Sequence, residues 1–315
     1  MSFQSINKVE SAQKMLDIAL KRVSKINFKK SKGDELSKAK KKELMKMDVV
    51  NQNVHSSLFR IIREFPALDN LSEFYSELLK SSLDFDRLKQ CLGAVNWADN
   101  QAKSLVLTHK KKVAAARSRE VLHSFMSAYL GRLSSVLKQV NPNLMFLEEA
   151  RKILKAFPVI KQVPTVCIAG FPNVGKSTLL GKITTSKPEI QNYAFTTKTL
   201  NLGYFDSEKG KVQVIDTPGT LARPEKMNNI ERQAYLAIKY QADLVVFVFD
   251  PTDTYELEKQ EQLLGMVKRF RKPVLFYLSK TDIASKEKIA LFEEKHDFVK
   301  TPSWLKEEII KRIAE

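Results

Sequence analysis

The stretch from Gly170 to Ser177, which reads GFPNVGKS, constrains the fold of this 315-residue chain more than any other. It matches the pattern G-x-x-x-x-G-K-[ST] of loops that cradle phosphate groups. Gly170 and Gly175 allow backbone turns that a Cβ atom would forbid, so that successive N–H groups can converge on phosphate oxygens. Lys176 places a positive charge at the β- and γ-phosphates, and the Ser177 hydroxyl can bind Mg²⁺. The stretch predicts a nucleotide-binding loop, provided that a strand precedes it and a helix follows it.

The residues on either side of this loop supply that context. Residues 165–169 form a short, apolar, β-rich run without alternation, as expected for a strand that is buried on both faces. Past residue 164, apolar strands alternate with candidate helices: the strands are residues 165–169, 212–215, 244–249 and 274–278, and the helices are residues 175–185, 228–240 and 255–270. This order predicts a three-layer α/β domain with a mostly parallel sheet. Residues 200–205 and 212–215 flank a turn and predict an antiparallel hairpin at the sheet edge.

The first half of the chain carries helical patterns almost throughout. Apolar residues recur at helical spacing and no stretch has the signature of a strand, which predicts a helical bundle. Asn141 followed by Pro142 predicts the N-cap and first turn of a separate last helix. Residues 158–164, which begin and end with proline, are interpreted as the domain boundary. The predicted fold class is an N-terminal helical bundle, residues 1–163, followed by a P-loop domain of the α/β class with a mostly parallel sheet, residues 164–315.

The net charge of +17 is distributed unevenly. Residues 1–163 hold 30 lysines and arginines against 16 acidic residues, whereas residues 164–315 hold 23 against 20. A surplus of that size in one half indicates a polyanion as the partner of the helical domain. No apolar run is long enough to cross a bilayer, the N-terminus lacks the apolar core of a signal peptide, and Cys91 and Cys167 are expected to be free thiols. These features predict a cytoplasmic protein without a membrane partner.

Two further segments carry chemistry beside the P-loop. Asp216 ends a predicted buried strand, where its carboxylate can reach the shell of a bound Mg²⁺, and the backbone N–H of Gly219 can sense a γ-phosphate. An ordinary turn is the alternative interpretation of this Asp-Thr-Pro-Gly segment. Residues 279–282, Ser-Lys-Thr-Asp, follow another strand, and the Asp282 carboxylate can accept hydrogen bonds from N1–H and the 2-amino group of guanine. A solvated loop with a surface charge pair is the alternative there.

These motifs, in this order, resemble those of the Obg-related GTPases. Residues 193–198, Tyr-Ala-Phe-Thr-Thr-Lys, together with residues 63–69 and 92–96 in the helical half, resemble the nucleolar GTP-binding protein 1 family over nearly the whole chain. The resemblance implies a GTPase that acts in assembly of the large ribosomal subunit, with the helical domain against rRNA of the precursor particle. By motif position it implies that Thr197, rather than Thr196, binds Mg²⁺. We expect an archaeal-type protein that ends with the GTPase domain and is a monomer when free.

The expected site residues fall into three groups. Catalysis is expected to depend on Lys176, Thr197 and Gly219. The residues expected to contact the nucleotide are Asn173, Val174, Gly175, Lys176, Ser177, Thr178, Ser279, Lys280 and Asp282. The residues expected to hold Mg²⁺ or its water shell are Ser177, Thr197 and Asp216. GTP or GDP is thus the expected ligand, and Mg²⁺ is the expected cofactor.

Two positions depart from the usual motifs. Ser279 stands where the guanine-reading motif carries asparagine, so guanine selectivity is expected to persist through Asp282 with reduced affinity. No glutamine follows Gly219 to orient the attacking water, which predicts slow hydrolysis that a partner or an ion stimulates. Asn173 allows two interpretations: its side-chain oxygen helps to bind K⁺ beside the phosphates, or it only forms a hydrogen bond within the loop as a turn residue.

Basic clusters in the helical half are the candidate RNA contacts: Lys29, Lys30, Lys32, Lys40, Lys41, Lys42, Lys110, Lys111 and Lys112. Few aromatic residues accompany them, which favours contacts with the backbone and shape of folded RNA over base stacking. The plainer interpretation is a solvated helix face. A nucleotide-gated scaffold with negligible turnover is the alternative function, and a membrane surface or a tubulin-type protein is the alternative partner. The basic residues cluster at helix ends and loops rather than opposite a bulky apolar face, which argues against a membrane.

Overall fold

The computed structural model of the protein describes residues 3–26, 34–185, 189–191, 200–208, 210–217, 229–252 and 254–314. The chain divides into two compact units. The helical unit comprises Ser2–Asn70 and Leu83–Lys155, and the sheet unit comprises Leu71–Ser82 and Ala156–Glu315. The predicted fold class, a helical domain followed by a P-loop domain with a mostly parallel sheet, is confirmed. The exact boundary between residues 163 and 164 stays a prediction.

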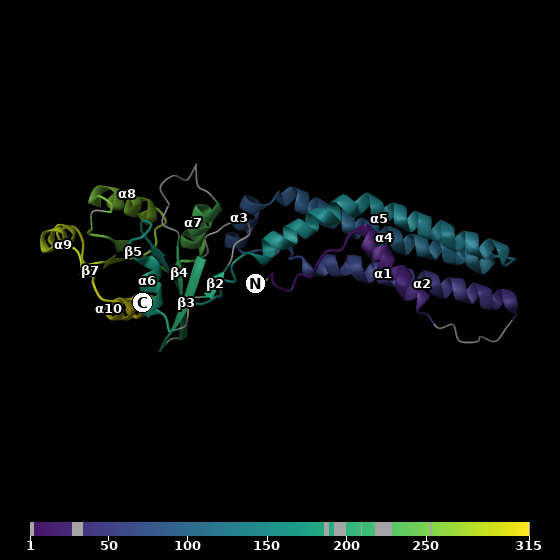
Figure 1. The fold of residues 1–315 in the computed structure, drawn as a ribbon, viewed down its shortest axis with the longest axis horizontal. Coiled ribbons are helices and arrows are strands. Elements are labelled where there is room, and N and C mark those ends of the chain that lie inside the picture. The colour runs from purple at the N-terminus through teal and green to yellow at the C-terminus, as the bar shows by residue number, and fades with distance from the viewer. Residues whose placement is uncertain are drawn as a thin grey trace. The chain divides into compact units, whose positions relative to one another are not determined.

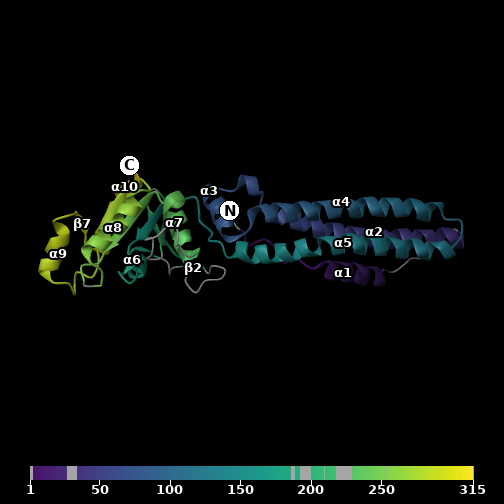
Figure 2. The same cartoon turned by 90° about the horizontal axis from the view of Figure 1, so that it is seen from above.

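Long amphipathic helices build the helical unit (Figures 1 and 2). In it, α2 (Glu35–Glu64), α4 (Phe85–Ala115) and α5 (Glu120–Lys155) run alongside one another, and the shorter α1 (Ala12–Ser24) packs against α2 and α5. Buried apolar residues recur every three or four positions along these helices, because only one stripe of each helix faces the common core. The helical spacing of apolar residues in the sequence therefore results from this packing.

The predicted helix break at Asn141 and Pro142 is wrong, because α5 continues through both residues. Proline lacks an N–H donor and normally disturbs a helix interior. Here the apolar stripe continues on both sides of it, with Leu137 and Leu144 buried. The Asn141 side chain does not cap a helix start; its Oδ1 accepts a hydrogen bond of 2.9 Å from the backbone N–H of Ala12. Tertiary packing overrides the local break signal.

A short helix from the first half of the chain belongs to the sheet unit. This helix, α3 (Glu73–Ser82), packs against α7 (Asn229–Gln241). The Tyr75 hydroxyl donates to the carbonyl of Pro158 at 2.7 Å and accepts from the N–H of Ile160 at 3.1 Å. Burial raises the pKa of the Tyr75 phenol, so the hydroxyl stays protonated and able to donate. These contacts tie α3 to the segment that leads into the sheet.

In the described residues, seven strands form one sheet in the order β2-β3-β4-β1-β5-β6-β7. The strands are β1 (Thr165–Ala169), β2 (Glu189–Gln191), β3 (Leu200–Ser207), β4 (Gly210–Asp216), β5 (Leu244–Phe249), β6 (Val274–Leu278) and β7 (Phe298–Val299). From β4 to β7 in this order, neighbouring strands are parallel, whereas β2 and β3 pair antiparallel. The predicted hairpin is confirmed as β3 and β4, which pair antiparallel around Gly210. β2 adds one more strand beyond the hairpin.

Helices cover both faces of this sheet (Figure 1). On one face α6 (Lys176–Ile183) and α10 (Pro302–Ala314) pack against each other and contribute to the buried core with the strands. On the opposite face lie α7 and α8 (Leu257–Lys268). The remaining helix of this unit, α9 (Lys286–Glu293), connects β6 to β7. Within the described ranges, no helix has both the length and the apolar character that a membrane span requires.

Candidate nucleotide site

The P-loop connects β1 to α6, and its course depends on two glycines. Gly170 has φ +147°, and a Cβ atom there would lie only 2.6 Å from the carbonyl oxygen of Val248. Gly175 has φ +97° and stands at the N-cap of α6. The predicted strand, loop and helix are thus present in the expected order. Asn173 has φ +60°, a conformation that asparagine tolerates better than most residues, which supports its interpretation as a turn residue.

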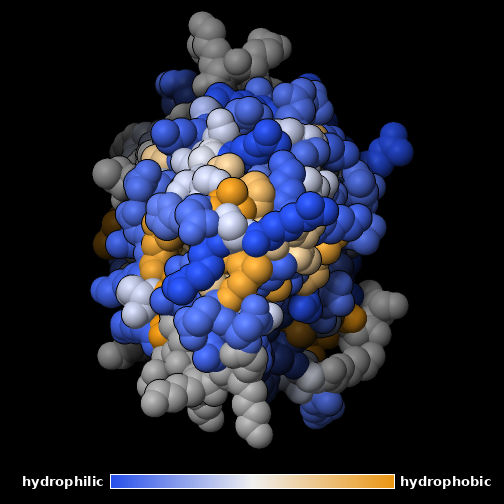
Figure 3. Space-filling view, turned by 90° about the vertical axis from the view of Figure 1, so that its right-hand side faces the viewer, coloured by the Kyte–Doolittle hydropathy of each residue, from blue (hydrophilic) through white to orange (hydrophobic). Residues whose placement is uncertain are grey.

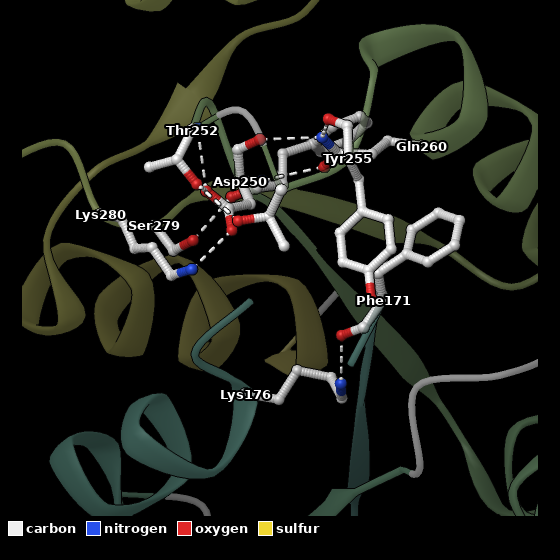
Figure 4. A network of polar contacts seen from close by, with 10 residues as sticks. Phe171, Lys176, Asp250, Thr252, Tyr255, Gln260, Ser279 and Lys280 are labelled. Carbon is white, nitrogen blue, oxygen red and sulfur yellow. Dashed lines mark hydrogen bonds and ion pairs between the residues drawn. The ribbon is translucent and has the colours of Figure 1, made fainter. Parts of the chain in front are cut away.

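The remaining P-loop residues differ in what they can offer to a phosphate. The Lys176 side chain lies inside the loop, and its Nζ donates to the Phe171 carbonyl at 2.6 Å (Figure 4). Val174 is fully buried in the core of the sheet unit, so it can offer a ligand only its backbone. Ser177 and Thr178 are exposed in the first turn of α6, where backbone N–H groups have no partner within the helix. Such a helix start attracts an anion.

A carboxylate at the end of β4 faces the Ser177 hydroxyl. Asp216 lies opposite Ile168 of β1, and its Oδ2 accepts a hydrogen bond of 2.5 Å from Ser177 Oγ. The Asn201 amide on β3 donates to the same oxygen at 3.2 Å. Asp216 is 6% exposed, and its Oδ1 is buried without a hydrogen-bond partner among the described residues. A buried, unpartnered carboxylate oxygen beside a hydroxyl fits a hydrated Mg²⁺, so Ser177 and Asp216 are the described residues that would hold this ion.

The segment expected to read guanine lies against the P-loop. The Ser279 Cβ atom is 3.8 Å from the position that a Cβ atom would take at Gly175. The Ser279 hydroxyl donates to the Phe249 carbonyl at 2.8 Å, so it is engaged with the sheet. Asp282 is exposed. Burial raises the pKa of the Tyr277 phenol, and the negative charge of Asp282 raises it further. The structure therefore brings the phosphate and base ends of the predicted site together.

Two buried residues of this site carry no motif in the sequence. Asp250 follows β5 and is fully buried; its carboxylate accepts hydrogen bonds from Lys280 Nζ at 2.7 Å and from the Thr252 hydroxyl at 2.6 Å. Gln260 of α8 is 1% exposed and binds the backbone of Asp250. A carboxylate directly after a parallel strand is the signal that could have indicated Asp250. Nothing local to Gln260 distinguishes it from other polar residues of a helix.

Several predicted site residues lie outside the described residues. They are Thr197 and Gly219 of the expected catalytic and metal groups, and Lys29, Lys30 and Lys32 of the expected RNA contacts.

The other predicted RNA contacts lie at one end of the helical unit, on α2 and α4. Lys40 Nζ donates to the carbonyl of Ala114 at 2.8 Å, near the C-terminus of α4, and Lys110 forms an ion pair with Asp48. Lys42 is exposed and has a contact of its own. Three exposed lysines form no ion pair within the described part of the chain: Lys41, Lys111 and Lys112. The fold thus joins two basic clusters that are distant in sequence.

The arrangement of this site defines a class of protein. A P-loop after a buried strand, a carboxylate on the neighbouring strand and a Lys-x-Asp segment against the loop are the parts of a P-loop GTPase. Comparisons with known proteins identify the family. Residues 3–161 match the family described as the NOG1 N-terminal helical domain, and residues 165–280 match the family described as 50S ribosome-binding GTPase. The chain belongs to the nucleolar GTP-binding protein 1 family.

Individual relatives resemble most of the chain. Nucleolar GTP-binding protein 1 of Drosophila melanogaster is 35% identical over 91% of this chain, and that of Arabidopsis thaliana is 33% identical over 98%. The chain spans about half of their length, 45% and 48% respectively. An uncharacterized protein of Methanocaldococcus jannaschii is 37% identical over 81% of this chain and 73% of its own length. These relatives agree with the family models in placing the chain in the nucleolar GTP-binding protein 1 family.

Proposed function

We propose that this GTPase acts in assembly of the large ribosomal subunit, where its helical unit docks on folded rRNA. The family descriptions support a ribosomal role, since one of the matching families is described as ribosome-binding. The observation that carries the proposal is the basic end of the helical unit, defined here by Lys41, Lys111 and Lys112. Figure 3 views the end of this unit where α4 ends and α5 begins, and hydrophilic residues cover most of that face, around hydrophobic residues near its centre.

Free lysines at this end are suited to phosphate contacts for a physical reason. A lysine that already pairs with a carboxylate, as Lys110 does with Asp48, has to give up that partner before it can bind a phosphate. Lys41, Lys111 and Lys112 are exposed and have no ion pair to break within the described residues. We therefore place the principal rRNA contacts on these three, with Lys40, Lys42 and Lys110 as secondary contacts. The predicted contacts Lys29, Lys30 and Lys32 remain part of the proposal.

The described geometry supports the proposed nucleotide chemistry. Lys176 would contact the β- and γ-phosphates, Ser177 and Asp216 would hold Mg²⁺ and its water shell, and Asp282 would read the guanine edge. Bound Mg²⁺ would neutralise charge on the phosphates. Thr197 and Gly219 complete the proposal as metal ligand and γ-phosphate contact. Because no glutamine follows Gly219, we propose that intrinsic hydrolysis is slow and that a partner or K⁺ raises it.

We also propose that the free protein is a monomer in the cytoplasm. Cys91 and Cys167 are both buried free thiols, as is usual in a reducing compartment.

Salt dependence of rRNA binding tests the proposal on the 315-residue chain. If about six phosphates are contacted, the logarithm of affinity for folded large-subunit rRNA should fall with the logarithm of salt at a slope near −4 to −5. Replacing Lys41, Lys111 and Lys112 by glutamate should flatten the slope by about 3. A matched control replaces three exposed lysines of the sheet unit, Lys286, Lys295 and Lys311, by glutamate. The control should change the slope much less.

The outcomes separate the competing functions. A chain that does not bind rRNA at low salt would contradict the docking proposal and indicate a protein partner. Equal effects of the two triple variants would show that binding follows net charge rather than the basic end of the helical unit. A single-turnover assay with GTP separates a GTPase from a scaffold, because the alternative of a nucleotide-gated scaffold predicts negligible hydrolysis even when rRNA is bound.

A further inference from the structure

An aromatic pair joins the P-loop to the segment that follows β5 (Figure 4). The rings of Phe171 and Tyr255 are stacked, with centroids 4.3 Å apart and planes inclined by 23°. Both rings also pack against the buried core of the sheet unit. Phe171 is the second residue of the P-loop, and its carbonyl oxygen accepts the hydrogen bond from Lys176 Nζ. A shift of the Phe171 backbone would therefore move the carbonyl that holds the Lys176 side chain.

Gln260 of α8 holds the other side of the aromatic pair. Its Nε2 donates to the carbonyl of Tyr255 at 2.9 Å and to the carbonyl of Asp250 at 2.8 Å. Its Oε1 accepts from the N–H of Asp250 at 2.9 Å. The side chain is buried, so these bonds are not exchanged for water and their loss would leave buried groups unpaired. Gln260 thus fixes both Asp250 and Tyr255 to the start of α8.

The same segment reaches the guanine-reading residues through Asp250. Its fully buried carboxylate forms an ion pair of 2.7 Å with Lys280. An unpaired carboxylate in this position would be strongly unfavourable, so the pair fixes the Lys280 side chain as well. A continuous series of contacts therefore runs from Phe171 through Tyr255, Gln260 and Asp250 to Lys280. Figure 4 shows this series, with Phe171 and Tyr255 on one side and Lys280 on the other.

We propose that Phe171, Tyr255 and Gln260 form a brace that positions the P-loop and Lys280 relative to each other for nucleotide binding. They are positioning residues, since they act through Lys176 and Lys280. The inference rests on the proposed nucleotide contacts of the sheet unit and is independent of rRNA. It names two residues outside the recognised motifs, Tyr255 and Gln260, and a variable position of the P-loop, Phe171, as determinants of guanine-nucleotide affinity.

The brace also accounts for serine at position 279. The Ser279 hydroxyl is engaged with the Phe249 carbonyl and does not serve the P-loop. A longer carboxamide side chain at this position would start 3.8 Å from the Cβ position of Gly175, close enough to tie the segment to the loop directly. With serine, the brace is one connection between the two ends of the site, beside the strand pairing of β1, β5 and β6. The Ser279→Asn substitution should therefore matter more when the brace is broken.

The dissociation rate of a fluorescent GDP analogue from the 315-residue chain tests the brace. Tyr255→Leu removes the stacked ring and keeps an apolar side chain. An aromatic pair changes an equilibrium constant by a factor of roughly 2 to 10 beyond the effect of the area it buries. Nucleotide dissociation should therefore become roughly 2- to 10-fold faster. Phe171→Leu should have the same effect, and the double variant should add little, because both changes remove one contact. If Tyr255→Leu does not fold, Phe171→Leu carries the test.

A matched control removes a different ring from the same unit. Tyr235 packs edge-on against Phe270, with ring centroids 4.9 Å apart. Tyr235→Leu should lower the melting temperature without accelerating nucleotide dissociation. The melting temperature of each variant, measured without nucleotide, separates a loss of stability from a change at the site.

The outcomes are distinct. Ser279→Asn should slow dissociation more in the Tyr255→Leu background than in the natural sequence, and an equal gain in both would contradict the compensation. If Phe171→Leu and Tyr255→Leu lower the melting temperature but leave the dissociation rate unchanged, the pair only stabilises the fold and the brace is refuted. A natural chain that does not bind the GDP analogue would instead refute the proposed nucleotide site.

Discussion

Replacing Asp216 by asparagine separates metal binding from folding. The Asp216 carboxylate accepts hydrogen bonds from Ser177 and Asn201 through Oδ2, and its buried Oδ1 has no partner among the described residues. An amide keeps an oxygen that can accept both bonds and removes the buried negative charge. Weakening two charge-assisted bonds costs about 1 kcal/mol each, and removing the buried negative charge offsets part of this cost, although the amide nitrogen that replaces Oδ1 is again unpartnered. Without Mg²⁺, the free energy of unfolding should therefore change by less than about 2 kcal/mol.

With GDP and Mg²⁺ present, the same substitution should have a large effect. An ion that binds only the folded protein, at 100 times its dissociation constant, adds about 2.7 kcal/mol to stability. In a domain of this size each kcal/mol raises the Tm by about 2–4 °C, so Mg²⁺ should raise the Tm of the natural chain by roughly 5–11 °C. Asp216→Asn removes an anionic group from the proposed metal shell and should lose most of this increment.

The two tryptophans make the measurement specific to one unit. Trp97 lies in α4 and Trp304 in α10, so a Trp97→Phe background leaves a single reporter in the sheet unit. Thermal unfolding followed by fluorescence, in GDP with either MgCl₂ or EDTA, gives the metal-dependent increment. Asp206→Asn, which removes an exposed carboxylate from β3, is the matched control. Two results would refute the assignment of this carboxylate to the metal. One is that Asp216→Asn keeps the full Mg²⁺-dependent rise in Tm. The other is that, without Mg²⁺, it lowers the free energy of unfolding by well above 2 kcal/mol.

Three further substitutions test other parts of the protein. Asp282→Asn should weaken GTP binding by about 3 kcal/mol, on the order of 100-fold, and improve binding of xanthosine triphosphate, whose C2 carbonyl matches an amide donor; unchanged GTP affinity in a calorimetric titration would place the base elsewhere. Asn173→Gly keeps the left-handed backbone but removes the side-chain oxygen, so it should abolish faster hydrolysis in KCl than in NaCl at matched ionic strength; equal rates of the natural chain in both salts would end the K⁺ hypothesis. Glu148→Gln should cost about 2 kcal/mol at pH 7, measured by urea unfolding. Burial opposes ionisation of Glu148, but hydrogen bonds from Arg151 and the Val9 N–H bring its pKa below the ordinary 4.5. The stabilisation by the ionised carboxylate is therefore fully present above pH 4.5 and is lost as the pH falls through the lowered pKa. An equal cost of the substitution at pH 7 and pH 3 would contradict this.

The nucleotide site was largely accessible from the sequence, because its chemistry needs fixed residue types at fixed spacing. Gly170, Gly175 and Lys176 are readable as a P-loop, and the structure shows why Gly170 cannot carry a Cβ atom. Asp216 and residues 279–282 could be placed near the loop because parallel strands end at one edge of a sheet. The helical half was equally readable, since a helix that buries one stripe has to repeat apolar residues every three or four positions.

Only the tertiary structure decided which contacts join these parts. The Phe171–Tyr255 stack, the Asp250–Lys280 ion pair and the pairing of Lys110 with Asp48 all join residues that are far apart in the chain, and local spacing contains no information about them. Packing also overrode a local signal at Pro142, where the buried apolar stripe of α5 continues through a residue that disfavours a helix interior. Local patterns record the conformational preference of each segment. The contact partners depend on the free energy of burying whole segments together, which only the folded chain determines.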